Sequence, residues 1–177
     1  MAVTLFSDGR IIDSNGINLA PKTVVDKWRL TAELVGNQDP VSSNLEREDT
    51  TGHGVPLGDS TGMTHSSGTW TFPSTGIWRV EANFSIHCSG STSTWCDMDV
   101  LYTTDNSTYY IGGRSVVGID QNGGYAQPSP TAIIDVTDTS QVKVRFRTQY
   151  ANTSATRIRG NSGSNYTYFT FTRIADT

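Results

Sequence analysis

The feature that most constrains the fold is a long run in which apolar and polar residues alternate. From Trp78 to Cys88 every second residue is apolar, and the residues between them are polar. Successive side chains of a β-strand point to opposite faces, so this pattern predicts one long strand with a buried side and a solvent-facing side. Strands of this kind are typical of antiparallel sheets that pack on one face only.

Shorter runs repeat the same alternation, and clusters of Gly, Asn, Asp and Ser that are typical of turns separate them. Thr and Ser make up roughly a quarter of the chain, and Thr fits a pleated surface better than a helix. The sequence therefore predicts an all-β, antiparallel domain: a sandwich, a barrel or a two-sheet jelly roll. The shorter runs cover residues 26–34, 96–102, 142–147 and 166–174, whereas residues 131–136 are expected to form a short, more fully buried strand.

Charge and leader signals narrow the class of protein. The net charge of −4 argues against a nucleic-acid-binding protein, which usually carries a basic stripe. Lys143, Arg145 and Arg147 follow at a period of two, which predicts the solvated face of one strand. No apolar run is long enough to insert into a membrane, and no secretory leader is visible. We therefore expect a protein made in a cytoplasm.

The two cysteines, Cys88 and Cys96, lie near the ends of two apolar runs joined by a link rich in Ser, Gly and Thr. They could face each other across a hairpin, so a disulfide is compatible with the sequence. For a product of the cytoplasm, two reduced and buried thiols are the favoured interpretation.

No motif predicts catalysis or a bound metal. Residues 58–62 match the Gly-x-Ser-x-Gly elbow of α/β-hydrolases, but that elbow needs a helix after the serine and none is predicted here. The three histidines share no metal-ligand spacing. Asp97, Asp99 and Asp105 are candidate calcium ligands, yet they are not gathered in one ligand-rich loop. We expect no enzyme activity, no cofactor and no metal.

Two parts of the chain are candidates for contact with other molecules. Residues 1–24 hold isolated apolar residues without sustained alternation, which predicts an N-terminal arm that wraps the body or docks onto a partner, while residues 25–177 form the head. Tyrosines in or beside predicted loops are candidate ligand contacts, because tyrosine is enriched at binding surfaces. These are Tyr109, Tyr110, Tyr125, Tyr150 and Tyr166.

A resemblance to a known fold begins at Met63. Trp70 follows seven residues later, Gly76 six residues after that, and then come Trp78 and Val80. This spacing resembles the aromatic–Gly–x–aromatic–x–apolar signature of the complement-type globular head, which is the tumour-necrosis-factor-like jelly roll. The resemblance implies that these five residues define the fold, with the glycine opening the turn into a long inner strand.

A closer resemblance is to small virion structural proteins of tailed phages, especially marine and cyanobacterial ones. It rests on pieces spread over residues 24–177: KWRLTAEL, VSSNLER, GMTHSSGTWTFPSTGIWRV, TDTSQVKVRFR and TFTRIADT. It implies a non-enzymatic homotrimer, made in the host cytoplasm and displayed on the outside of the virion, whose partners are phage capsid or tail proteins.

Two roles remain open within this resemblance. A capsid decoration, or cement, protein would dock through residues 1–24. The tip of a tail fibre would instead bind a host surface glycan or protein through loops such as 104–109, 120–130 and 150–165. The short arm and the absence of a stalk favour decoration. An unrelated β-sandwich, such as a carbohydrate-binding module or a small hydrolase, is the remaining alternative.

Overall fold

The computed structural model describes residues 3–5, 11–13, 24–48 and 62–177, and these ranges contain only strands, turns and irregular segments. Every strand pairing in them is antiparallel. None of the described residues belongs to a helix that could cross a membrane. The all-β, antiparallel class predicted from the alternating runs is therefore confirmed.

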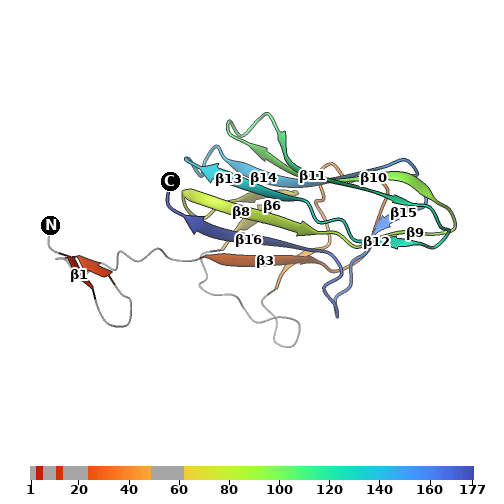
Figure 1. The fold of residues 1–177 in the computed structure, drawn as a ribbon, viewed down its shortest axis with the longest axis horizontal. Coiled ribbons are helices and arrows are strands. Elements are labelled where there is room, and N and C mark those ends of the chain that lie inside the picture. Colours follow the sequence, from red (N-terminus) through yellow and green to blue (C-terminus); the bar gives the residue numbers. More distant parts are fainter. Residues whose placement is uncertain (1–2, 6–10, 14–23, 49–61) are drawn as a thin grey trace.

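Two five-stranded sheets form the body of the molecule (Figure 1). The central pairs of both sheets join strands from distant parts of the chain, which is the crossed connectivity of a jelly roll, whereas β10–β11 and β6–β7 are hairpins. The first sheet, the β8 sheet, has the order β13 (Thr131–Val136), β8 (Gly76–Asn83), β16 (Tyr168–Ala175), β3 (Val25–Leu30) and β5 (Leu45–Arg47). The second, the β10 sheet, has the order β11 (Tyr110–Ile119), β10 (Ser93–Thr103), β14 (Lys143–Tyr150), β7 (Thr69–Thr71) and β6 (Thr64–Ser66).

A smaller sheet closes one end of the sandwich (Figure 1). Three of its strands come directly before or after strands of the β8 sheet in the sequence: β9 follows β8, β12 precedes β13 and β4 follows β3. Its order is β12 (Tyr125–Ala126), β9 (Ile86–Cys88), β15 (Thr156–Ile158) and β4 (Leu34–Val35). Near the N-terminus, β1 (Val3–Leu5) and β2 (Ile11–Asp13) pair only with each other. This hairpin lies within the predicted arm and was not expected from the sequence.

Aromatic rings from both sheets meet in the core. Trp70 of the β10 sheet is fully buried and lies 5.0 Å from Phe146 and 5.6 Å from Phe169, measured between ring centres. Phe146 and Phe169 stack at 4.0 Å across the two layers. Edge and offset contacts of this kind stabilise a core beyond the burial of apolar area alone. The two sheets therefore pack face to face through this aromatic core.

All five signature residues are buried. Met63, Trp70, Trp78 and Val80 are all buried in this core. Gly76 opens β8 with a φ of +134°, a conformation that side chains with a Cβ avoid. A Cβ there would also lie 2.6 Å from Arg173 Nε and 2.7 Å from the Ala175 carbonyl oxygen.

The prediction of one unbroken strand from Trp78 to Cys88 is wrong. β8 ends at Asn83 and β9 begins at Ile86 in the smaller sheet. Between them the Phe84 N–H donates to the Pro128 carbonyl, and the Ser85 N–H donates to Thr167 Oγ1. Phe84 and Ile86 are both buried, so the alternation continues through a break at which the chain changes sheets. The run over 26–34 likewise divides into β3 and β4. The expectation that residues 131–136 are more fully buried is also wrong, because every second residue of β13 is exposed on the outer face of its sheet.

The predicted solvated face of Lys143, Arg145 and Arg147 is also wrong in part. The three side chains do share one face of β14, but Lys143 is buried and its Nζ donates to the Thr139 carbonyl at 2.6 Å. Arg147 stands opposite Asp99 of β10 in the register and forms an ion pair with it at 2.7 Å. The neighbouring strand β10 and the turn before β14 thus supply partners for this face, which the sequence of β14 alone does not reveal.

Candidate functional site

The predicted contact tyrosines separate into two ends of the molecule and one core position. Tyr109 and Tyr110 lie at the hairpin between β10 and β11, far from the smaller sheet (Figure 1). Tyr110 is exposed, and the Tyr109 ring lies under the guanidinium of Arg145 at 4.0 Å. Tyr125 belongs to β12 at the opposite end.

The structure does not place Tyr150 at the surface, where the sequence predicts a ligand contact. It ends β14 and is buried, on the inward face shared with Val144 and Phe146. Burial raises the pKa of its phenol well above the ordinary value. Tyr150 has the same parity as Val144 and Phe146, so the alternation of β14 extends three residues beyond Arg147, where the predicted run ends.

The carboxylates weighed as calcium ligands do not converge. Asp99 is fully buried between Arg114 and Arg147. Asp105 accepts hydrogen bonds from Thr103 Oγ1 and from the N–H groups of Thr108 and Ser107 in its own loop, which lower its pKa to about 2. Within the described ranges, no three His, Cys, Asp or Glu side chains are grouped so as to hold a metal ion. Residues 58–61 of the hydrolase-like motif lie outside the described residues.

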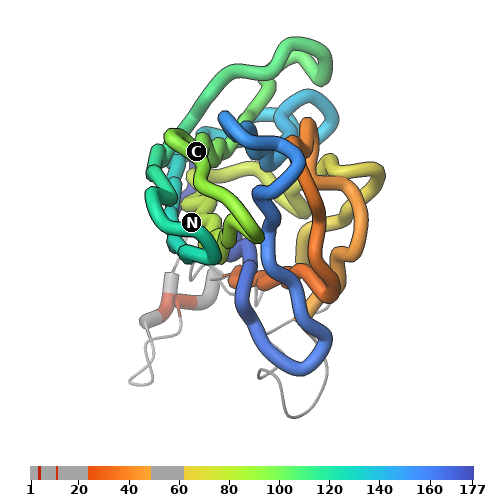
Figure 2. The backbone as a smooth tube through the Cα atoms, turned by 90° about the vertical axis from the view of Figure 1, so that its right-hand side faces the viewer, coloured from red at the N-terminus to blue at the C-terminus, as the bar shows by residue number. Residues whose placement is uncertain are grey.

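One cluster at the small-sheet end brings together two of the loops expected to bind a ligand, 120–130 and 150–165. We call His87, Tyr125, Arg159 and Tyr166 the Tyr–Arg cluster. The Arg159 guanidinium carbon lies 4.0 Å from the ring centre of Tyr166 and 4.9 Å from that of Tyr125. The rings of Tyr125 and His87 stack at 5.0 Å with an interplanar angle of 15°. Figure 2 views the molecule from this end.

Backbone contacts fix the cluster in place. Tyr125 and His87 are directly opposite each other in the β12–β9 register, which is why their rings stack. The Arg159 N–H donates to the Ser85 carbonyl at 2.8 Å. The next residue, Gly160, packs so closely on the backbone of Ala32 that a Cβ would overlap it. The guanidinium is therefore presented by a chain segment held on both sides.

Sequence reasoning identified Tyr125 and Tyr166 but missed Arg159 and His87. The arginine follows β15 and the histidine lies within β9, so only the pairing of strands distant in sequence brings them to the tyrosines. A pattern confined to one strand carries no signal for such a cluster.

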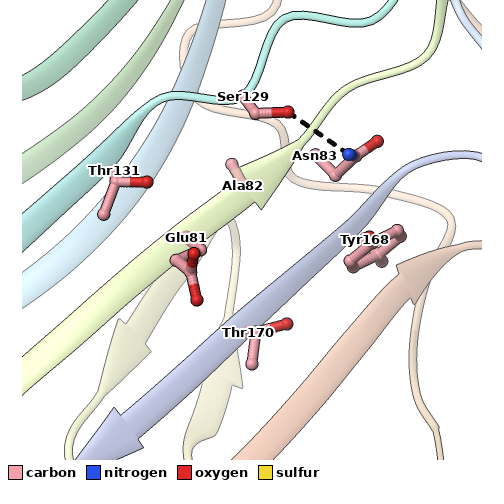
Figure 3. Close-up of a pocket in the computed structure, with 7 residues that line it drawn as sticks. All are labelled: Glu81, Ala82, Asn83, Ser129, Thr131, Tyr168 and Thr170. Carbon is pink, nitrogen blue, oxygen red and sulfur yellow. Dashed lines mark hydrogen bonds between the residues drawn. The ribbon is translucent and has the colours of Figure 1, made fainter.

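A second feature is a pocket of about 290 Å³ on the outer face of the β8 sheet (Figure 3). Six of its seven lining residues carry a hydroxyl, amide or carboxylate group, and Asn83 Nδ2 donates to Ser129 Oγ at 3.2 Å. It contains no histidine or cysteine, so it offers hydrogen bonds rather than a nucleophile paired with an imidazole base. The lining residues are Glu81, Ala82, Asn83, Ser129, Thr131, Tyr168 and Thr170.

Comparison with known proteins gives the fold. No protein-family model and no curated protein sequence matches the chain. Among solved structures, murine APRIL at pH 5.0 is similar with a TM-score of 0.62 and 10% identity over 86% of this chain and all of that one. Eiger TNF from S. frugiperda is similar with a TM-score of 0.61 and 7% identity over 89% of this chain and 96% of that one. The chain therefore has the tumour-necrosis-factor-like jelly-roll fold that its Met63–Val80 signature implied.

Proposed function

We propose that the protein is a non-catalytic structural component of a phage particle, a homotrimer that decorates the outside of the capsid. The resemblance of residues 24–177 to small virion proteins of tailed phages supports the phage origin. The observation that supports the trimer is the composition of the outer face of the β8 sheet.

Three pairs of opposite charges lie on this face, and the exposed carboxylate of Asp135 accepts a hydrogen bond from Thr177 Oγ1. A charge buried without a partner is costly, whereas one that keeps its partner can be covered by another protein at a lower cost. A second copy of the chain can cover these pairs without isolating an ion. The pairs are Arg79–Glu81 at 2.7 Å, Lys27–Glu48 at 2.8 Å and Arg29–Glu46 at 2.8 Å.

The same face also offers groups that a neighbouring copy could cover with a gain in free energy. Ile133 of β13 is 60% exposed and stands beside Arg79 in the register. Tyr168 and Thr170 line the pocket of Figure 3, which is large enough to receive a side chain. Removing exposed apolar area from water favours association, and aromatic residues are enriched in interfaces.

The oligomer is tested by measuring its mass in solution by light scattering. One chain has a mass of 19.2 kDa, so a trimer has a mass of about 58 kDa. Ile133→Asp should dissociate it, because it buries an unpaired charge at the interface. The control is Val116→Asp, at a residue that is 56% exposed on β11 of the other sheet. A monomeric wild type refutes the proposal, and a trimer that tolerates Ile133→Asp places the interface elsewhere.

The decoration role is tested with purified capsids. Deleting residues 1–20 should abolish binding while the trimer persists, because the arm is the proposed docking segment. Binding that survives the deletion rejects docking through the arm. Copy number separates decoration from the tail-fibre alternative: hundreds of copies per particle indicate decoration, and a dozen or fewer indicate a tail component.

A further inference from the structure

We propose that the Tyr–Arg cluster binds the carboxylate of an acidic saccharide. The site would add recognition to the structural role, and it depends neither on trimer formation nor on docking through residues 1–24. The proposal rests on one cation without an acidic partner and on two exposed aromatic rings beside it.

Arg159 differs from most described Lys and Arg side chains, which form ion pairs with Asp or Glu. Its partners are the rings of Tyr125 and Tyr166 and a contact of 3.5 Å from Nη1 to Ser85 Oγ. A guanidinium has five N–H donors, so most of them face water. In a chain with a net charge of −4, an unneutralised arginine held in place is a ready anion site.

The two tyrosine rings give the site exposed aromatic surface that a sugar can contact. Tyr125 remains 63% exposed and Tyr166 36% exposed, although both contact the guanidinium. The C–H groups of a pyranose ring can contact the parts of these rings that Arg159 and His87 leave exposed, while the phenol hydroxyls reach the sugar hydroxyls. Apolar surface with a few fixed polar groups is the usual composition of a small-ligand site.

The number of charges favours a carboxylate over a polyanion. Nucleic acids and other phosphate-rich polymers are bound by several Lys and Arg side chains along a track. Here a single guanidinium is available, because the nearby Arg157 is already paired with Glu33 at 3.7 Å. One planar cation matches one planar carboxylate, which it can bind through two parallel hydrogen bonds.

Preorganisation should make even a small site effective. Arg159 is held by its N–H bond to the Ser85 carbonyl, and the N–H of Asn161 donates to the Leu30 carbonyl at 3.0 Å. Tyr125 is braced by the ring of His87. A ligand would therefore order few side chains on binding, which lowers the entropic cost of association.

The test uses the full-length protein and saturation-transfer NMR with titration. The probes are N-acetylneuraminic acid, glucuronic acid, glucose, acetate and inorganic phosphate. We expect both acidic sugars to bind and glucose not to bind. Arg159→Gln should weaken the affinity roughly tenfold to a hundredfold, since it removes charge-assisted hydrogen bonds.

Arg145→Gln is the matched control. Arg145 also lacks an acidic partner and lies 4.0 Å from a tyrosine ring, that of Tyr109, but its Nε donates to Thr69 Oγ1 and it contacts only one ring. This variant should bind the acidic sugars as the wild type does. Tyr166→Ala should lower the affinity for the sugars and leave any weak binding of acetate unchanged. Thermal unfolding of each variant checks that it is folded.

Three results would overturn the proposal. The first is no saturation transfer from the protein to either acidic sugar at about 10 mM, a concentration at which even a weak site is populated. The second is an Arg159→Gln variant that binds as well as the wild type, or an Arg145→Gln variant that loses as much. The third is acetate or phosphate binding as tightly as the sugars, which would indicate a general anion site without recognition of the sugar ring.

Discussion

Asp99→Ala should be among the most destabilising changes on the surface-facing side of the β10 sheet. The Asp99 side chain is 0% exposed, and Arg114 donates to it at 2.6 and 2.9 Å while Arg147 donates at 2.9 and 2.7 Å. Removing one partner of a buried ion pair costs about 3–5 kcal/mol. The two arginines are 35% and 20% exposed, so water recovers part of this cost. We therefore expect a loss of about 3 kcal/mol.

Urea unfolding followed by tryptophan fluorescence measures this loss directly. All samples need one protein concentration, because association would add to the apparent stability. The midpoint of thermal unfolding should fall by roughly 6–12 °C for a chain of this size. The control is Asp97→Ala, which removes a carboxylate on the same face that contacts Arg114 at 3.2 Å and is 18% exposed. Its expected cost is below about 1 kcal/mol, and equal losses in the two variants would refute the reasoning.

The contribution of Asp99 should also depend on pH. Burial alone would raise the pKa of its carboxyl, but the hydrogen bonds and charges of Arg114 and Arg147 outweigh burial and hold the pKa below the ordinary value of 3.8. A lowered pKa in the folded state stabilises the protein above pH 3.8, and this stabilisation is lost as the pH falls towards the folded value. The difference in unfolding free energy between wild type and Asp99→Ala should thus be constant near neutral pH and narrow below pH 3.8. A difference that widens there would contradict the assignment.

Two further predictions concern the backbone and the thiols. Gly76→Ala should lower the free energy of unfolding more than Gly90→Ala does, as thermal unfolding can measure. Gly76 combines a φ of +134° with crowding by Arg173, whereas Gly90 has a φ of +78° and open space around it. Gly90→Ala should lose about 1 kcal/mol of stability, and equal losses in the two variants would exclude crowding as the cause. Cys88 and Cys96 are free and buried, and burial raises the pKa of the Cys96 thiol. A thiol reagent at pH 8 should therefore modify neither cysteine until the protein is unfolded. Rapid labelling of the native protein would show instead that the thiols are accessible.

Part of the fold could be predicted from the sequence because that part depends on local periodicity. The alternation in β8 and β14 indicated which side chains enter the core, and Gly76 marked the start of β8 because few other residues tolerate its backbone conformation. The break between Asn83 and Ile86 left no such trace. Both sides of the break keep the same parity, and the hydrogen bonds that redirect the chain come from Pro128 and Thr167, which are distant in sequence.

Only some residues of the candidate site could be predicted from the sequence. Tyr125 and Tyr166 could be marked as loop tyrosines, but Arg159 becomes a site residue only because the pairing of β9 with both β12 and β15 places it beside them. The sequence offered no means of telling this arginine from Arg157, which is paired with Glu33.

The sequence by itself determined that this chain forms antiparallel strands with one apolar face, and that Met63 to Val80 follow a jelly-roll signature. Only the tertiary structure decided the state of the opposite face. Asp99 has the parity of a solvent-facing residue, yet it is buried because the register sets Arg114 and Arg147 on either side of it. Periodicity reports the face on which a side chain lies, whereas burial on that face depends on what the neighbouring strands place there.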